Sequence, residues 1–106
     1  MVAARSAMSI INERGFIQLP VEFEKTGYKH KQIRREGNLA IYERSKVKGP
    51  TKQIHYEVVR IKENNAYIMD GHSIPAREGY PSDKAWGKFG WTCVDLKRAH
   101  QKFEQL

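Results

Sequence analysis

Hydrophobic and polar residues alternate along the middle of the chain, a pattern that predicts β-strands. In residues 39–44, Leu39 and Ile41 are expected to face the core. Tyr42 and Arg44 fall on the other face and are expected to face solvent. Four or five short strands are predicted in this way, within residues 28–35, 39–44, 53–62, 66–69 and 73–77.

Turn and breaker residues separate these segments. Glu36-Gly37-Asn38 has the composition of a turn, and Asn64-Asn65 is expected to turn a hairpin. Asp70-Gly71 is a strong hairpin signal. Pro75 lacks a backbone donor, which places the last predicted strand at a sheet edge. Val58-Val59 breaks the alternation, and either a central strand covered on both faces or a bulge explains this.

The end of the chain carries the clearest helix signal. Thr92 and Asp95 have capping-box spacing and predict a helix over residues 93–105. Just before it, large aromatic residues are expected to close the core: Trp86, Phe89 and Trp91. The helix has one apolar stripe: Leu96, Ala99, Phe103 and Leu106. The predicted fold is therefore α+β, an antiparallel β-meander of four to five strands with a C-terminal amphipathic helix packed on one face.

The length of 106 residues predicts a single domain over residues 1–106. Residues 1–15 are expected to form either a short helix, over 2–13, or a flexible arm. Residues 1–8 have one arginine and no apolar run, unlike a secretory signal, and Met1 and Met8 are equally acceptable as the natural start. No apolar run approaches the roughly 20 residues needed to span a bilayer, so no membrane association is expected.

Charge changes this picture, because the net charge of +7 is concentrated in residues 25–52. That segment has nine basic and two acidic residues, while basic and acidic residues balance elsewhere. A basic cluster of this kind is typical of proteins that bind nucleic acid through phosphates, with little sequence readout. The predicted nucleic-acid-binding residues are Lys29, Lys31, Arg34, Arg35, Tyr42, Arg44, Lys46, Lys48 and Lys52.

The same residues have a purely structural explanation. Lysines protect sheet edges and keep a surface soluble, and tyrosines are good strand residues. On the functional interpretation, Tyr28, Tyr42 and Tyr56 are exposed and stack on unpaired bases, while Lys46–Lys52 reaches phosphate. Both interpretations remain open at the level of sequence.

Catalytic and metal-binding signals are weak. The four histidines, at positions 30, 55, 72 and 100, fall in separate elements and form no pair at metal-ligand spacing. Asp70–Ser73 offers an acid, a base and a hydroxyl, but a hairpin turn explains these residues equally well. Cys93 is the single cysteine, which excludes an internal disulfide or cysteine zinc site and favours the cytoplasm. No cofactor or metal is expected, and an enzyme is the least favoured class.

One resemblance adds an alternative function. Leu39–Glu43, Pro81, Trp86-Gly87 and Gly90–Thr92, followed by the helix stripe, resemble small proteins carried by phages and mobile elements. This resemblance implies an intracellular protein-interaction module that inhibits a host defence or replication complex. It supplies no catalytic or binding residue. The expected partner is accordingly DNA or RNA, or an acidic or nucleoprotein host complex.

Overall fold

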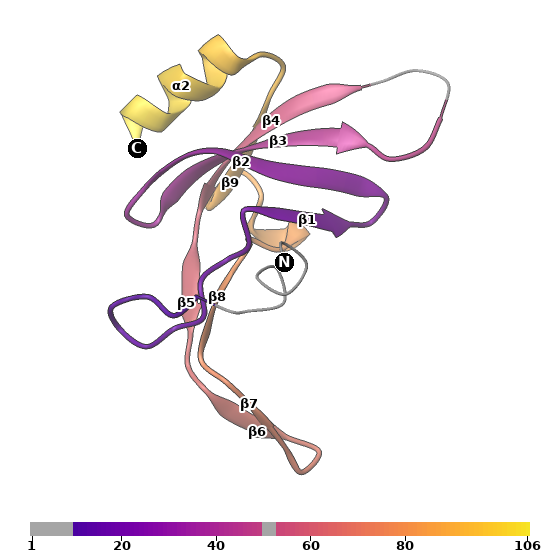
Figure 1. Ribbon diagram of the computed structural model, residues 1–106. Coiled ribbons are helices and arrows are strands. Elements are labelled where there is room, and N and C mark those ends of the chain that lie inside the picture. The colour runs from indigo at the N-terminus through magenta and orange to yellow at the C-terminus, as the bar shows by residue number, and fades with distance from the viewer. Residues whose placement is uncertain (1–9, 50–52) are drawn as a thin grey trace, which may run out of the picture. The chain divides into compact units, whose positions relative to one another are not determined.

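The computed structural model describes residues 10–49 and 53–106 (Figure 1). The length of the chain predicts one domain, and the contacts within the structure form two compact units. We call residues 20–61 and 80–106 the sheet unit, and the described part of residues 1–19 together with residues 62–79 the hairpin unit. In the described part of the chain, no helix has the length and apolarity that crossing a bilayer requires.

The sheet unit contains five antiparallel strands in the spatial order β1-β2-β3-β4-β9. Helix α2 (Leu96–Gln105) packs against β3, β4 and β9 (Figure 1). The predicted fold class, an antiparallel sheet with a C-terminal helix on one face, is therefore confirmed. The strands are β1 (Glu22–Lys25), β2 (Tyr28–Glu36), β3 (Leu39–Lys46), β4 (Ile54–Arg60) and β9 (Gly90–Cys93), and a short 3-10 helix, η1, spans Asp83–Ala85.

The membership of the sheet differs from the prediction. Strands β6 (Tyr67–Met69) and β7 (His72–Ile74) pair with each other and not with the large sheet. Strand β5 (Lys62–Asn64) pairs with β8 (Arg77–Gly79), so Asn64-Asn65 does not turn a hairpin. Strand β9, absent from the prediction, occupies the sheet edge instead.

The hairpin unit confirms one turn and corrects the N-terminal helix. Asp70 and Gly71 have φ angles of 51° and 76°, the positive values that a tight two-residue hairpin turn needs. Residues 10–13 form a bridge and a turn, in which the Asn12 N–H donates to the Phe16 carbonyl at 2.8 Å. The predicted helix is therefore wrong for these four residues, and its remainder lies outside the described residues.

The core between sheet and helix follows the predicted stripe. Ile41 and Val58 pair across β3 and β4 and are buried with Ala99 and Phe103 of α2. The helix begins at Leu96 and not at residue 93, because Thr92 continues strand β9. The Asp95 side chain alone caps the helix, accepting a hydrogen bond from the Arg98 N–H at 2.8 Å, so the predicted capping box is wrong.

The opposite face of the sheet is also covered. Ala40 and Val59 pair there, and both are fully buried. Tyr42 has 0% exposure, so its predicted solvent-facing position is wrong. The Tyr42 hydroxyl donates to the Pro20 carbonyl at 2.9 Å and accepts from Gln32 Nε2 at 2.9 Å. Burial of both Val58 and Val59 confirms the prediction of a central strand covered on both faces.

The aromatic residues before the helix close the core only in part. Trp86 and Trp91 are half-buried, on opposite faces of the sheet. Phe89 is 44% exposed, which corrects its predicted place in the core. The reason is that Phe89 lies in the turn of residues 87–89, which precedes β9 and is outside the strand that pairs with β4.

Candidate functional site

The register of the sheet divides the predicted basic residues between two faces. Residues directly opposite each other on paired strands share a face, and successive residues alternate. A bulge between Gln32 and Arg34 shifts the register by one residue. As a result, Lys29, Lys31 and Arg34 lie on the face that α2 covers, whereas Arg35, Arg44 and Lys46 lie on the opposite face. The basic residues that are clustered in the sequence therefore do not form one surface in the structure.

Lys29 and Lys31 have acidic neighbours across the strands. Lys29 lies opposite Glu24 of β1. Lys31 lies between Glu22 of β1 and Glu43 of β3. Opposite charges in such positions attract each other, so these two lysines contribute little uncompensated positive charge.

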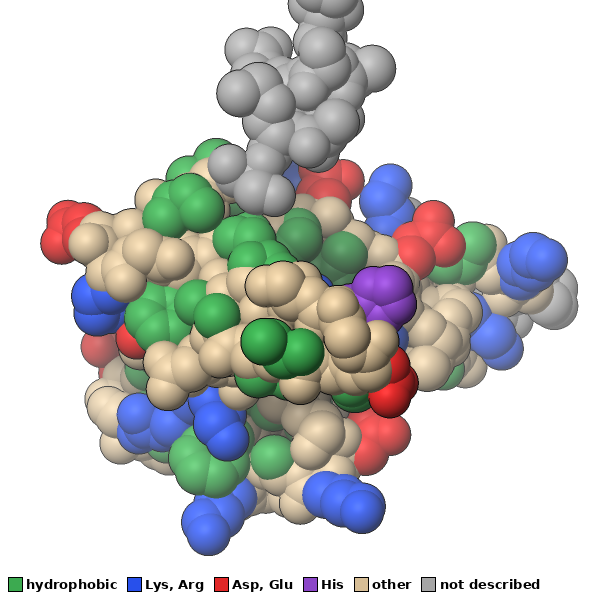
Figure 2. Space-filling view, turned by 90° about the horizontal axis from the view of Figure 1, so that it is seen from below, with side chains coloured by type: hydrophobic (Ala, Val, Ile, Leu, Met, Phe, Trp, Pro, Cys, Tyr) green, Lys and Arg blue, Asp and Glu red, His purple; other side chains and the backbone are tan. Residues whose placement is uncertain are grey.

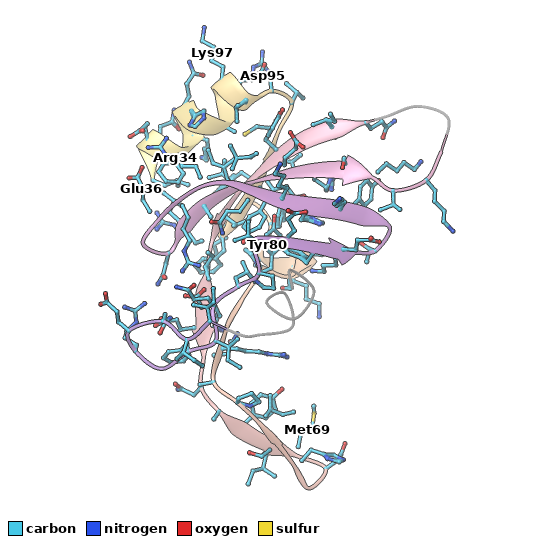
Figure 3. The ribbon with its side chains drawn as sticks, viewed as in Figure 1. Arg34, Glu36, Met69, Tyr80, Asp95 and Lys97 are labelled. Carbon is cyan, nitrogen blue, oxygen red and sulfur yellow. The ribbon has the colours of Figure 1, made fainter. Side chains whose placement is uncertain are left out.

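Arg34 connects the sheet to the helix. Its Nη2 atom donates to Glu36 Oε2 and to Glu104 Oε2, both at 2.7 Å, and Nη1 lies 3.0 Å from Nδ1 of His100. Its guanidinium lies 3.8 Å from the centroid of the Phe103 ring. The hydrogen bonds that Arg34 donates to Glu104 and Glu36 raise the pKa of Arg34. Figure 3 shows Arg34 beside Glu36, next to the helix. This arginine therefore has a structural role.

The remaining predicted arginines are also held by the protein. Arg35 Nε donates to the Gly37 carbonyl at 2.8 Å, within the β2–β3 turn. Arg44 Nη1 donates to Glu57 Oε2 at 3.2 Å. Lys52 lies outside the described residues. Of the predicted basic residues in the described part of the chain, Lys46 and Lys48 are thus the ones left exposed without a compensating neighbour in the sheet register.

These two lysines lie at one end of the sheet. Tyr28 pairs with both Lys25 and Lys46, which places the three side chains in one row. The Val47 N–H donates to the Gly27 carbonyl at 3.0 Å, so the β3–β4 loop contacts the β1–β2 turn. We call the group formed by Lys25, Lys46 and Lys48 the basic end; Lys25 was not among the predicted site residues.

A cavity of about 300 Å³ adjoins the basic end on the face opposite α2. Strands β1 to β4 and β9 contribute its floor, and residues 80–86 form one wall. We call this cavity the polar pocket. Its lining includes Lys25, Tyr28, His30, Arg44, Glu57, Tyr80, Asp83, Trp86 and Thr92. In Figure 3, Tyr80 lies on the other side of the sheet from α2, which carries Lys97.

A buried carboxylate lies at the floor of the polar pocket. Glu57 and His30 are each only 4% exposed, and Glu57 Oε1 lies 3.5 Å from His30 Nε2. The same oxygen accepts a hydrogen bond from the Tyr80 hydroxyl at 2.6 Å, while Oε2 accepts from Arg44. Burial by itself raises the pKa of Glu57, but the hydrogen bonds from His30 and Tyr80 and the charge of Arg44 outweigh it. The pKa of this carboxyl therefore lies below its ordinary value, and it is ionised at neutral pH.

Aromatic rings fix these polar groups in place. The Phe23 ring stacks on His30 with a centroid distance of 4.7 Å and an interplanar angle of 3°. The Tyr80 ring contacts both of these rings edge-on, and burial together with the charge of Glu57 raises the pKa of Tyr80. Tyr80 therefore remains a hydrogen-bond donor. The Arg44 guanidinium lies 4.5 Å from the centroid of the Tyr28 ring, at the wall of the pocket.

Two buried atoms of the pocket residues lack a hydrogen-bond partner among the described residues: His30 Nδ1 and Arg44 Nε. Native proteins satisfy most buried polar atoms, so such atoms call for an explanation. His30 and Arg44 are direct cross-strand neighbours. Because both atoms are buried, the structure does not offer either of them to a molecule in the pocket.

Sequence reasoning missed the pocket residues His30, Glu57 and Tyr80. His30 and Glu57 share a face with Tyr42, which the alternation predicts to meet solvent. The available signal was the Val58-Val59 pair, which is explained by a strand covered on both faces. The described residues contain no group of three His, Cys, Asp or Glu side chains placed to hold a metal ion.

Comparisons with protein-family models, curated proteins and solved structures find no match to this chain.

Proposed function

We propose that the sheet unit binds nucleic acid through its basic end, with contacts mainly to phosphate. The observation that carries this proposal is the meeting of Lys25, Lys46 and Lys48 at one end of the sheet, beside a pocket with aromatic walls. The other basic residues of the segment that the structure describes have carboxylate neighbours or fixed partners. The proposed interface is therefore smaller than the one that charge counting predicts.

Lysine side chains suit this role because their ammonium groups are mobile point charges that reach phosphates without demanding one geometry. Phosphate contacts position the nucleic acid but carry no sequence information. Binding of this kind releases counterions and weakens as salt rises. We therefore propose binding with little sequence preference and a strong dependence on salt.

The test compares two variants that lose the same charge. Lys46→Gln/Lys48→Gln neutralises the basic end, and Lys29→Gln/Lys31→Gln neutralises the lysines that face acidic neighbours. Anisotropy titrations with single- and double-stranded DNA and RNA at several salt concentrations measure affinity. The first variant should lose on the order of tenfold in affinity at low salt. The slope of its log affinity against log salt concentration should be shallower, by an amount equivalent to roughly one to two phosphate contacts.

The second variant is the matched control and should bind almost like the wild type. Equal losses in both variants would show that net charge and not the basic end governs binding. Wild-type binding no tighter than that of an unrelated basic protein would refute the proposal itself.

A second candidate function, binding to a protein partner, is favoured by the hairpin unit. Tyr67, Ile68 and Met69 of β6 are 48%, 76% and 49% exposed, and Asp70 and His72 are the only ionisable groups at this tip besides Tyr67. Figure 2 shows hydrophobic side chains exposed among polar ones on the face seen there, and Figure 3 shows Met69 projecting from the hairpin. An apolar, weakly charged hairpin suits a protein surface better than a phosphate backbone.

This candidate is the alternative of a phage or mobile-element inhibitor of a host complex. Ile68→Ser should abolish co-purification of a stoichiometric host protein if the hairpin is the contact. Lys46→Gln/Lys48→Gln should leave that co-purification intact. The opposite pattern would favour nucleic acid held at the basic end.

A further inference from the structure

The polar pocket has the size of a small-ligand site. Its volume of about 300 Å³ lies at the lower end of the range for pockets that hold small molecules. Lys25 belongs to both the pocket lining and the basic end, and the lining residue Tyr28 pairs with Lys25. A nucleotide whose phosphate contacts the basic end would therefore have its base next to the pocket.

The charges that line the pocket balance. Lys25 and Arg44 contribute two positive charges, and Glu57 and Asp83 contribute two negative ones. A cavity without net charge gives no electrostatic preference to a phosphate over a neutral group. Its aromatic residues Tyr28, Tyr80 and Trp86 offer ring surfaces instead. The lining therefore favours a neutral planar ring over a second phosphate.

We infer that the polar pocket receives an unpaired nucleobase of the nucleic acid whose phosphates contact the basic end; this inference rests on the proposed function. The base stacks against the aromatic wall. Because every base has a ring face, the pocket distinguishes unpaired from paired nucleic acid more than one base from another.

The first experiment separates the contribution of the bases to the affinity from that of the sugar-phosphate backbone. The probes are a single-stranded DNA about eight nucleotides long and an abasic chain of the same length. Both are titrated against the full-length protein by anisotropy at one low salt concentration. The base-bearing chain should bind on the order of tenfold tighter, as expected for one stacked base, and both affinities should fall in Lys46→Gln/Lys48→Gln.

Variants then assign the difference to the pocket. Tyr28→Ala should remove most of the preference for the base-bearing chain while leaving the affinity for the abasic chain unchanged. Tyr67→Ala, an exposed tyrosine of the hairpin unit, is the matched control and should keep the preference. Circular dichroism and a thermal melt check that each variant folds.

A direct measurement does not depend on the fold of Tyr28→Ala. The chain has two tryptophans, so Trp91→Phe leaves Trp86 of the pocket as the single tryptophan fluorophore. The base-bearing chain should quench this fluorescence, and the abasic chain should leave it unchanged. Stacking of a base near an indole ring is the physical cause.

The outcomes distinguish the two levels of the proposal. Equal binding of both chains without quenching would overturn the pocket inference and leave phosphate binding intact. Quenching by a free nucleoside but not by the oligonucleotide would assign the pocket to a small heterocycle and also overturn the inference. Failure of both chains to bind would overturn the proposed function, and the pocket inference with it.

Discussion

The two faces of the five-stranded sheet are both buried, but by different means. On the helix face, Ile41, Val58 and Phe103 form an apolar cluster, and Arg34 covers the Phe103 ring at its edge. On the pocket face, Glu57 and His30 are equally buried and each needs a specific partner. Apolar packing is non-directional and is favourable wherever water is removed, whereas a buried charge is costly unless its partners are in place.

This difference indicates which face of the sheet is the better candidate for a functional site. The helix face accounts for the stability of the fold without further explanation. The pocket face incurs the cost of desolvating a carboxylate, and among the described residues His30 Nδ1 and Arg44 Nε have no hydrogen-bond partner. A purely structural role would be met more simply by apolar side chains. We therefore assign the fold to one face and the candidate site to the other.

The largest expected effect comes from breaking the helix face. Phe103→Ala should lower the free energy of unfolding by about 3–5 kcal/mol, because it removes a buried ring from the core. Urea denaturation followed by circular dichroism measures this loss. Phe89→Ala is the matched control and should lose only about 1 kcal/mol, since Phe89 is 44% exposed. Similar losses for both variants would contradict the assignment of the core.

A smaller effect is expected from a single atom on the pocket face. Tyr80→Phe removes the hydroxyl that donates to Glu57 and keeps the ring against Phe23 and His30. Losing one hydrogen bond to an ionised carboxylate should lower the free energy of unfolding by about 1.5–3 kcal/mol. Tyr56→Phe, on the helix face, is the control and should change stability less. An unchanged stability of Tyr80→Phe would show that the network contributes nothing.

The subtlest distinction between the faces is their response to acid. The folded-state pKa of Glu57 is lowered, so its contribution is present above the ordinary carboxyl pKa and is lost as pH falls through the folded value. Denaturation curves from about pH 6 to about pH 3 should therefore show falling stability. Glu57→Gln should flatten part of this fall.

Glu63 of the hairpin unit has a lowered pKa as well, chiefly through its hydrogen bond from Arg14. Glu63→Gln therefore serves as the comparison, and its acid response identifies what this second carboxyl contributes. A Glu57→Gln variant with the same pH dependence as the wild type would be incompatible with a stabilising, ionised Glu57.

Sequence pattern was sufficient for the elements whose signals are local. Alternation located β2, β3 and β4, and the spacing of Leu96, Ala99 and Phe103 located the helix. Strand β9 was missed because it is short and because Thr92 and Asp95 imitate a capping box. Only its pairing with β4, distant in the sequence, makes residues 90–93 a strand.

The candidate site was harder to predict from the sequence, because the register of the strands and not their composition brings its residues together. His30, Arg44 and Glu57 come from three strands, and only the antiparallel pairing brings them together. Tyr42 was misplaced through the assumption that one face of the sheet meets water. The Val58-Val59 pair already indicated that both faces are covered, and extending that signal to the neighbouring strand would have placed Tyr42 inside.

The late position of β9 in the chain has a consequence for the order of folding. Strands β1 to β4 follow one another along the chain, whereas β9 reaches β4 only after the chain has passed through residues 61–89. Contacts distant in sequence bear a larger loop-closure entropy and tend to form late. We expect Trp91→Phe to accelerate unfolding with little change in the folding rate, and Ile41→Val to slow folding, in stopped-flow measurements.

Equal effects of the two substitutions on the folding rate would contradict this order. Thr92 of β9 lies opposite Glu57 and lines the polar pocket. If β9 docks last, the polar pocket is completed only in the final step of folding. A chain that stalls before that step has most of its sheet and no pocket.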